Sequence, residues 1–172
     1  MITLAELNVL PTDEFVVRLA GIFERSPWVA QRIAAARPFD SPQHLLAAMR
    51  TAVAEATAAE QLALIRAHPK LGLRGQAREE LTAASTREQR GAGLDACAPG
   101  EVALLDELNA AYAEKFAMPF ILAVRGHTSQ SIIATCKRRL LNDGLSERRA
   151  ALHEIGLIAG YRLADVVSDT GK

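Results

Sequence analysis

A histidine followed directly by a proline is the first feature of this sequence that points to chemistry. His68 lies at the expected end of a helix, because Pro69 disfavours helical geometry in the residue before it. An imidazole titrates near neutral pH, so His68 can donate or accept a proton under physiological conditions. The structural alternative is a histidine in a last helical turn that interacts favourably with the helix dipole. The pair therefore predicts either a rigidly held acid–base group or a helix-ending residue.

A carboxylate follows 20 positions later, in the segment Ser85-Thr86-Arg87-Glu88-Gln89. The spacing of Ser85 and Glu88 is that of a capping box, which predicts a helix beginning near Ser85 with the Glu88 carboxylate accepting from the Ser85 backbone N–H. The start of a helix also gathers free N–H groups and partial positive charge, which suit an anionic or carbonyl-bearing ligand. In that interpretation Glu88 and Gln89 contribute polar groups to the ligand, and the spacing leaves both interpretations open.

An arginine interrupts an apolar stretch near the C-terminus. Arg162 lies between Tyr161 and Leu163, and Leu163 and Val166 belong to the buried stripe of a predicted helix. A guanidinium fork binds a carboxylate through two parallel hydrogen bonds. The structural alternative is an arginine whose charge reaches solvent or pairs with an acidic side chain.

Several other kinds of site have no support in the sequence. The four histidines form no metal-binding pair at helical spacing, so we expect no metal. Glycine-rich phosphate loops and the G-x-S-x-G nucleophile motif are absent as well. Cys97 and Cys136 are expected to be reduced thiols, with Cys136 on an apolar helix face. The pairs Arg138-Arg139 and Arg148-Arg149 are expected on solvated helix faces.

The elements that must position these residues are predicted to be helices. Capping residues, prolines and apolar spacing place helices after Thr12, after Ser26-Pro27, after Ser41-Pro42, over 58–67, from near Ser85, from Pro99 to Pro119, over 129–141 and over 146–167. Phe120–Val124 is expected to be a short extended or irregular apolar segment bounded by Gly126. No set of alternating strands is present, so we predict an all-α, single-domain bundle of about eight to nine helices over residues 1–172.

Charge and composition narrow the partners. The 20 basic and 20 acidic residues give no net charge, which argues against nucleic acid or an anionic membrane as the main partner. The longest apolar run, residues 118–124, is far shorter than the about 20 residues of a membrane span. The N-terminal residues lack the pattern of a secretory signal and the C-terminal residues lack a peroxisomal tripeptide, so we expect a cytoplasmic protein.

Four motifs occur along the chain in a specific order and spacing. They are Ala67-His68-Pro69-Lys70-Leu71-Gly72, Ser85-x-x-Glu88-Gln89-x-x-Ala92-Gly93-Leu94-Asp95, Leu108-Asn109-x-x-Tyr112-x-x-Lys115-Phe116-x-x-Pro119-Phe120-Ile121, and Glu154-Ile155-x-x-Ile158-Ala159-x-x-Arg162-Leu163-x-Asp165. Together they resemble the 2-oxo-4-hydroxy-4-carboxy-5-ureidoimidazoline (OHCU) decarboxylases of urate degradation. The resemblance covers essentially the whole chain.

The resemblance implies an all-helical, cofactor-independent carboxy-lyase, commonly a homodimer, that converts OHCU to (S)-allantoin with loss of CO₂. It implies that His68 is the catalytic histidine, that Pro69 lines the pocket, that Glu88 is the acidic catalytic partner and that Arg162 faces the substrate carboxylate or carbonyl. It further implies two substrate-binding segments, Ser85, Thr86, Arg87, Glu88 and Gln89, and Phe120, Ile121, Leu122, Ala123 and Val124, the second through its backbone. Ala117-Met118 departs from the glycine-containing pair of many relatives, which puts only fine substrate preference in doubt.

The chemistry is compatible with an enzyme that uses no cofactor. The carbon of OHCU that loses CO₂ adjoins a ring C=N bond, so the substrate carries its own electron sink. The protein must orient the carboxylate, stabilise charge on the ring and deliver one proton to one face, and either His68 or Glu88 can return that proton to carbon. Two alternatives remain: a helical adaptor that binds a partner helix, and a relative that acts on another ureido acid.

Overall fold

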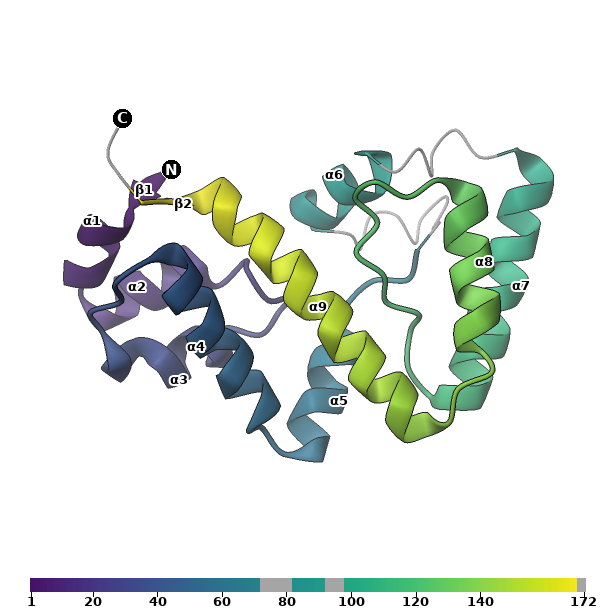
Figure 1. Ribbon diagram of the computed structural model, residues 1–172, viewed down its shortest axis with the longest axis horizontal. Coiled ribbons are helices and arrows are strands. Elements are labelled where there is room, and N and C mark those ends of the chain that lie inside the picture. The colour runs from purple at the N-terminus through teal and green to yellow at the C-terminus, as the bar shows by residue number, and fades with distance from the viewer. Residues whose placement is uncertain (72–81, 92–97, 170–172) are drawn as a thin grey trace. The chain divides into compact units, whose positions relative to one another are not determined.

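The computed structural model describes residues 1–71, 82–91 and 98–169 (Figure 1). Within these residues the chain forms nine α-helices, a short 3-10 helix and a two-stranded sheet, so the prediction of a mostly helical protein is confirmed. Among the helices described, none combines the length and the apolar character that a membrane crossing requires. The chain divides into two compact units, Met1–Ala67 with Gly156–Lys172, and His68–Ile155.

The first unit is made from the N-terminal helices and the C-terminal end of the chain. Its elements are β1 (Ile2–Thr3), α1 (Leu4–Val9), α2 (Thr12–Leu19), α3 (Trp28–Ile33), η1 (Ala34–Ala36), α4 (Pro42–Ala54), α5 (Ala58–Ala67), the last part of α9 (Gly144–Val166) and β2 (Val167–Ser168). The strands β1 and β2 pair in parallel, with Ile2 opposite Val167 (Figure 1). This two-residue pairing was not predicted, because a strand of that length leaves no period-2 pattern in the sequence.

Two Ser-Pro pairs that look alike in the sequence behave differently. Ser41 caps α4 by accepting a hydrogen bond from the His44 backbone N–H at 3.0 Å, and Pro42 is the first helical residue, as predicted. The same prediction for Ser26 is wrong, because α3 begins at Trp28 after Pro27 without a side-chain cap. The Ser26 N–H already bonds to the Phe23 carbonyl at 3.1 Å, so Ser26 belongs to the preceding turn.

The second unit holds α6 (Ala83–Gly91), α7 (Pro99–Phe116), α8 (Ser129–Arg139) and the first part of α9. Helices α7 and α8 pack against each other. Cys136 is fully buried on α8, as predicted, and burial raises the pKa of its thiol to about 11, so the thiol stays protonated at neutral pH. Cys97 and residues 72–79 of the predicted loop lie outside the described residues.

Helix α7 ends three residues before Pro119, the residue that the sequence predicts as its end. The helix ends at Phe116, and Ala117 adopts the left-handed conformation with φ +53°, ψ +30°. A residue with a Cβ is disfavoured in this conformation, and glycine is the usual choice at the position after a helix. The chain therefore turns before Pro119.

We expect Ala117→Gly to raise the free energy of unfolding by about 0.5–1 kcal/mol, because glycine adopts a left-handed conformation without the Cβ clash. Urea unfolding followed by circular dichroism measures the change. Ala110→Gly, at an exposed position inside α7, is the matched control and should instead lower stability by about 1 kcal/mol. A lower stability for Ala117→Gly would contradict the argument.

Candidate functional site

The helix that precedes His68 ends where the His68-Pro69 pair predicts. Helix α5 ends at Ala67, and the His68 side chain that follows is only 5% exposed. Three residues further on, the Leu71 carbonyl accepts a hydrogen bond from Nδ2 of the buried Asn109, at 2.9 Å. Because Asn109 belongs to α7, the segment that carries His68 is attached to the core of the second unit.

Glu88 does not cap helix α6. Helix α6 begins at Ala83, two residues before the predicted start, and the Ser85 backbone N–H donates to the Thr82 hydroxyl at 3.3 Å. The Thr82 and Ser85 hydroxyls are also 3.0 Å apart. The first turn of α6 is therefore capped by Thr82, and the predicted Ser85–Glu88 capping box is wrong. Glu88 lies in the second turn, where its carboxylate is not needed for the cap.

Burial distinguishes the faces of α6. Ser85 is buried, while Thr86 and Glu88 are half-buried and Arg87 is exposed. Residues three and four apart share a helix face, so Ser85, Glu88 and Gln89 follow one line along α6. The side chain of Gln89 lies outside the described part of the chain, and of the other four predicted substrate-binding residues of α6 Arg87 is the most exposed.

The segment Phe120–Val124 has no regular secondary structure, as predicted, and all five residues are buried. In Figure 1 it lies in the long connection between α7 and α8. The connection turns at Gly126, whose φ of +82° is a conformation that favours glycine.

The expectation that the backbone of this segment awaits a ligand is wrong for three of its polar groups. The Ile121 carbonyl accepts from the Arg139 guanidinium at 2.5 Å, and the Ala123 N–H donates to the Glu154 carboxylate at 2.9 Å. The Val124 carbonyl accepts from the His127 N–H at 2.9 Å. Among the hydrogen bonds of the described residues, none uses the backbone of Leu122. The protein itself therefore holds the segment and leaves one peptide position between two anchored ones.

The predicted position of Arg139 is wrong. The residue was expected on a solvated face, but it is 5% exposed and lies 2.7 Å through Nε from the Glu147 carboxylate, which is fully buried. The available signal was its position on the stripe of Ile132 and Cys136, at helical spacing. Arginine is rarely assigned to such a stripe without knowledge of its partner, and Glu147 comes from the next helix.

Two further groups complete the cluster around Glu147. The Tyr112 hydroxyl donates to one carboxylate oxygen, and Asn142 Nδ2 donates to the other at 2.7 Å. Burial, and then the hydrogen bond to Glu147, raise the pKa of the Tyr112 phenol, so this phenol stays a donor at any physiological pH. Tyr112, Arg139 and Glu147 thus form a buried, hydrogen-bonded group within the second unit, which we call the Arg139 cluster.

Arg162 is buried in the first unit. Its Nη1 lies 2.9 Å from a carboxylate oxygen of Glu24, which is 2% exposed, and 3.4 Å from the Gly21 carbonyl. The ion pair agrees with the structural alternative that the sequence left open for Arg162. A buried guanidinium beside a carboxylate is also restrained in orientation, which is a requirement for binding a second carboxylate through the fork.

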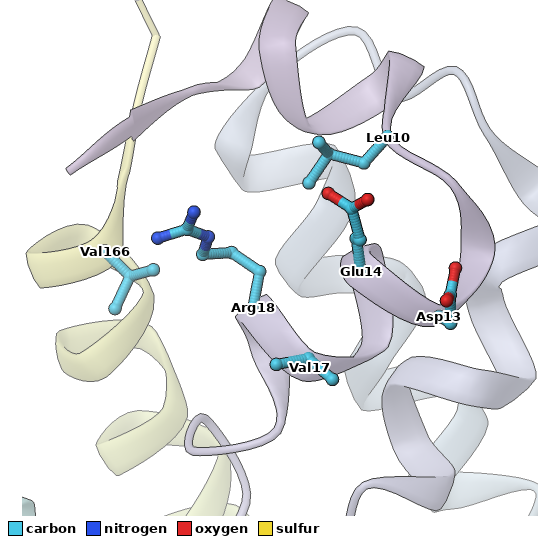
Figure 2. Close-up of a pocket in the computed structure, with 6 residues that line it drawn as sticks. All are labelled: Leu10, Asp13, Glu14, Val17, Arg18 and Val166. Carbon is cyan, nitrogen blue, oxygen red and sulfur yellow. The ribbon is translucent and has the colours of Figure 1, made fainter.

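A surface cavity of about 530 Å³ lies elsewhere in the first unit (Figure 2). Its lining residues are Leu10, Asp13, Glu14, Val17, Arg18 and Val166. Figure 2 shows the Glu14 and Arg18 side chains extending from the same helix, α2, along the depression. None of the predicted site residues lines this cavity, and four of its six lining residues are exposed, so it is an open depression of mixed charge.

Comparisons with known proteins agree over nearly the whole length. Residues 8–164 match the family model described as OHCU decarboxylase. The chain is 41% identical over 164 residues to the 2-oxo-4-hydroxy-4-carboxy-5-ureidoimidazoline decarboxylase of Haloferax volcanii, covering 95% of each chain. It is also 41% identical to the uric acid degradation bifunctional protein of Bacillus sp., where the match covers 96% of this chain and 32% of that protein.

A solved structure supports the same assignment. The crystal structure of (S)-allantoin synthase superposes with a TM-score of 0.79 at 26% sequence identity. The match covers 96% of this chain and 54% of that one, so this chain spans about half the length of that protein. With a family model that matches more than half of the chain, and relatives above 30% identity, the chain belongs to the OHCU decarboxylase family.

Proposed function

We propose that this protein is an OHCU decarboxylase, which releases CO₂ from OHCU to form (S)-allantoin in urate degradation. The observation that carries the proposal is the full-length match to the family and to the decarboxylase of Haloferax volcanii. The names of the other relatives support the substrate and the product, since one degrades uric acid and the other synthesises (S)-allantoin.

The reaction balances without an external electron acceptor. The bond between the ring carbon and the carboxylate breaks, and its electron pair flows toward the adjacent ring C=N bond. The ring nitrogen that receives the electron pair takes up one proton, and the carbon that bears the ureido group takes up a second. The neighbouring hydroxyl loses its proton to become the ring carbonyl of allantoin. Delivery of the proton to one face makes a single enantiomer, so the protein must position the acid as well as the substrate.

We assign the proton transfers to His68 and Glu88. The first is buried at a corner anchored to α7, and the second is half-buried on α6 without a role in the helix cap. Pro69 removes a backbone freedom beside His68, which helps to fix the direction of the imidazole. Burial strengthens the electrostatic effect of both groups on a developing charge.

The remaining predicted residues bind the substrate in this proposal. The guanidinium of Arg162 attracts the substrate carboxylate until CO₂ leaves. Ser85, Thr86, Arg87 and Gln89 contribute the polar groups of α6. The segment Phe120–Val124 contacts the ring and the ureido end through its backbone. Phe120 and Leu122 are the two positions of this segment whose N–H and C=O make no hydrogen bond among the described residues.

We further propose a single functional domain over residues 1–172, acting as a cytoplasmic homodimer. The family match supports the first point, because residues 8–164 include parts of both compact units. The resemblance to the OHCU decarboxylases, which are commonly homodimers, supports the homodimer.

The test is the decay of OHCU generated from urate. We expect the purified protein to speed the loss of OHCU absorbance and to yield one enantiomer of allantoin, which circular dichroism detects. A helical adaptor would leave the spontaneous decay and its racemic product unchanged. A relative specific for another ureido acid would act on that compound while leaving OHCU untouched, and either result would refute the proposal.

A further inference from the structure

We propose that Arg139 is a positioning residue that holds the substrate-binding segment Phe120–Val124 in its working conformation, with Glu147 and Tyr112 fixing the direction of its guanidinium. The inference rests on the proposed function, because it names a residue that acts on the substrate through the backbone of another segment. It concerns a side chain that the sequence motifs of the family resemblance did not include.

The contacts of Arg139 reach two consecutive residues of the segment. Its Nη1 donates to the Ile121 carbonyl at 2.5 Å, and its guanidinium carbon lies 4.9 Å from the centre of the Phe120 ring. The first contact sets the direction of a peptide group, and the second sets the plane of an aromatic side chain. One side chain of α8 thus restrains both the backbone and a ring at the start of the segment.

The guanidinium is itself held from the opposite side. Its Nε and Nη2 lie 2.7 Å and 2.5 Å from Oε1 of Glu147. Tyr112 donates to the same oxygen, and Asn142 donates to the other one. A carboxylate that accepts hydrogen bonds from these directions has little freedom to rotate, so the arginine fork is restrained as well.

A buried ion pair by itself contributes little to the free energy of unfolding. Removing two charges from water costs free energy that their attraction barely returns, and apolar side chains of equal volume are often at least as stable. Directional hydrogen bonds do supply orientation, which apolar packing does not. The Arg139 cluster is therefore better suited to fixing the conformation of the segment that it contacts than to raising stability.

A second anchor completes the arrangement. Glu154 on α9 accepts from the Ala123 N–H at 2.9 Å, two residues after the carbonyl that Arg139 holds. Leu122 lies between the two anchored positions, and its peptide groups are among those proposed to meet the ligand. A shift of either anchor would move Leu122, and a displacement of about 1 Å is enough to impair a positioned reaction strongly.

The experiment compares Arg139→Lys with the parent protein. A lysine keeps the charge but has no planar fork, so it does not hold Glu147 and the Ile121 carbonyl together. We expect KM for OHCU to rise about 10-fold, the loss expected for a charged hydrogen bond, while kcat per folded molecule changes less. Tyr112→Phe, which preserves volume, should raise KM by roughly 3-fold because Glu147 loses one donor.

Arg50→Lys is the matched control. Arg50 also holds a backbone carbonyl, that of Gly156, through Nε at 3.2 Å and Nη2 at 2.7 Å, but it belongs to the first unit. The Arg50→Lys variant should have a lower free energy of unfolding and an unchanged KM for OHCU.

The outcomes separate the two proposals. If the parent fails to speed the decay of OHCU, the proposed function is wrong. If the parent is active and both Arg139→Lys and Tyr112→Phe keep the parental KM, with only the melting temperature lowered, the cluster is structural and the inference is overturned. Since KM does not depend on the fraction of folded molecules, partial unfolding of one variant does not imitate the expected result. Should Arg139→Lys not fold, Tyr112→Phe alone decides, and a parental KM in that variant counts against the inference.

Discussion

His68→Asn is expected to lower OHCU turnover by about 10²- to 10⁴-fold, the usual contribution of a positioned acid or base. Asparagine is polar and of similar size, so it fits a site that leaves His68 only 5% exposed, but it does not titrate near neutral pH. The rate of OHCU loss and the circular dichroism of the allantoin formed measure the effect. The product that does form should approach a racemate, because the spontaneous reaction then dominates.

His153→Asn is the matched control for this experiment. His153 is an exposed residue of α9 in the same compact unit, and it has no part in the proposed chemistry. Its replacement should leave both rate and product unchanged. A His68 variant that decarboxylates OHCU at the parental rate would remove the central assignment, and the imidazole would then be a helix-ending residue only.

Glu88→Gln is expected to reduce kcat by about 10²- to 10³-fold while the free energy of unfolding stays within about 0.5 kcal/mol of the parent. The amide keeps the shape of the side chain but neither accepts nor returns a proton. Stability should be preserved because the first turn of α6 is capped by Thr82, whose hydroxyl accepts from the Ser85 N–H. Single-turnover kinetics and urea unfolding measure the two quantities.

Thr82→Ala provides the comparison that makes this result interpretable. Loss of a threonine cap usually costs about 1 kcal/mol, so this variant should be less stable than Glu88→Gln. The opposite pattern, with Glu88→Gln destabilised and still active, would return Glu88 to the structural role that its spacing first suggested.

Much of the helical architecture was readable from local patterns. Helix α5 has the predicted bounds, and α4 begins at Ser41-Pro42 as its cap and proline indicated. Of the four residues that helical spacing places on one apolar stripe of α4, Leu45, Met49 and Val53 are buried and Leu46 is half-buried. These features depend on neighbours within one or two turns, and sequence spacing reports such neighbours directly.

The sequence did not determine helix termini where several residues can serve as the cap. Ser85 and Thr82 both carry a hydroxyl, and only the backbone conformation shows that α6 begins at Ala83. Helix α7 likewise stops at Ala117 in the left-handed conformation, for which the alanine side chain gives no signal. In both cases residue type permits the outcome without selecting it.

The order and spacing of the four motifs were enough to indicate the family. The roles of His68, Glu88 and Arg162 stay predictions from that resemblance. The partners of the buried charges needed the tertiary structure. Arg162 pairs with Glu24, 138 positions away, and Arg139 holds the carbonyl of Ile121, 18 positions away. A buried charge is stable only beside its partner, and that partner is chosen by the packing of distant helices rather than by any local period. For this reason the sequence alone placed Arg139 on the surface, whereas in the folded chain it is buried in contact with the proposed substrate-binding segment.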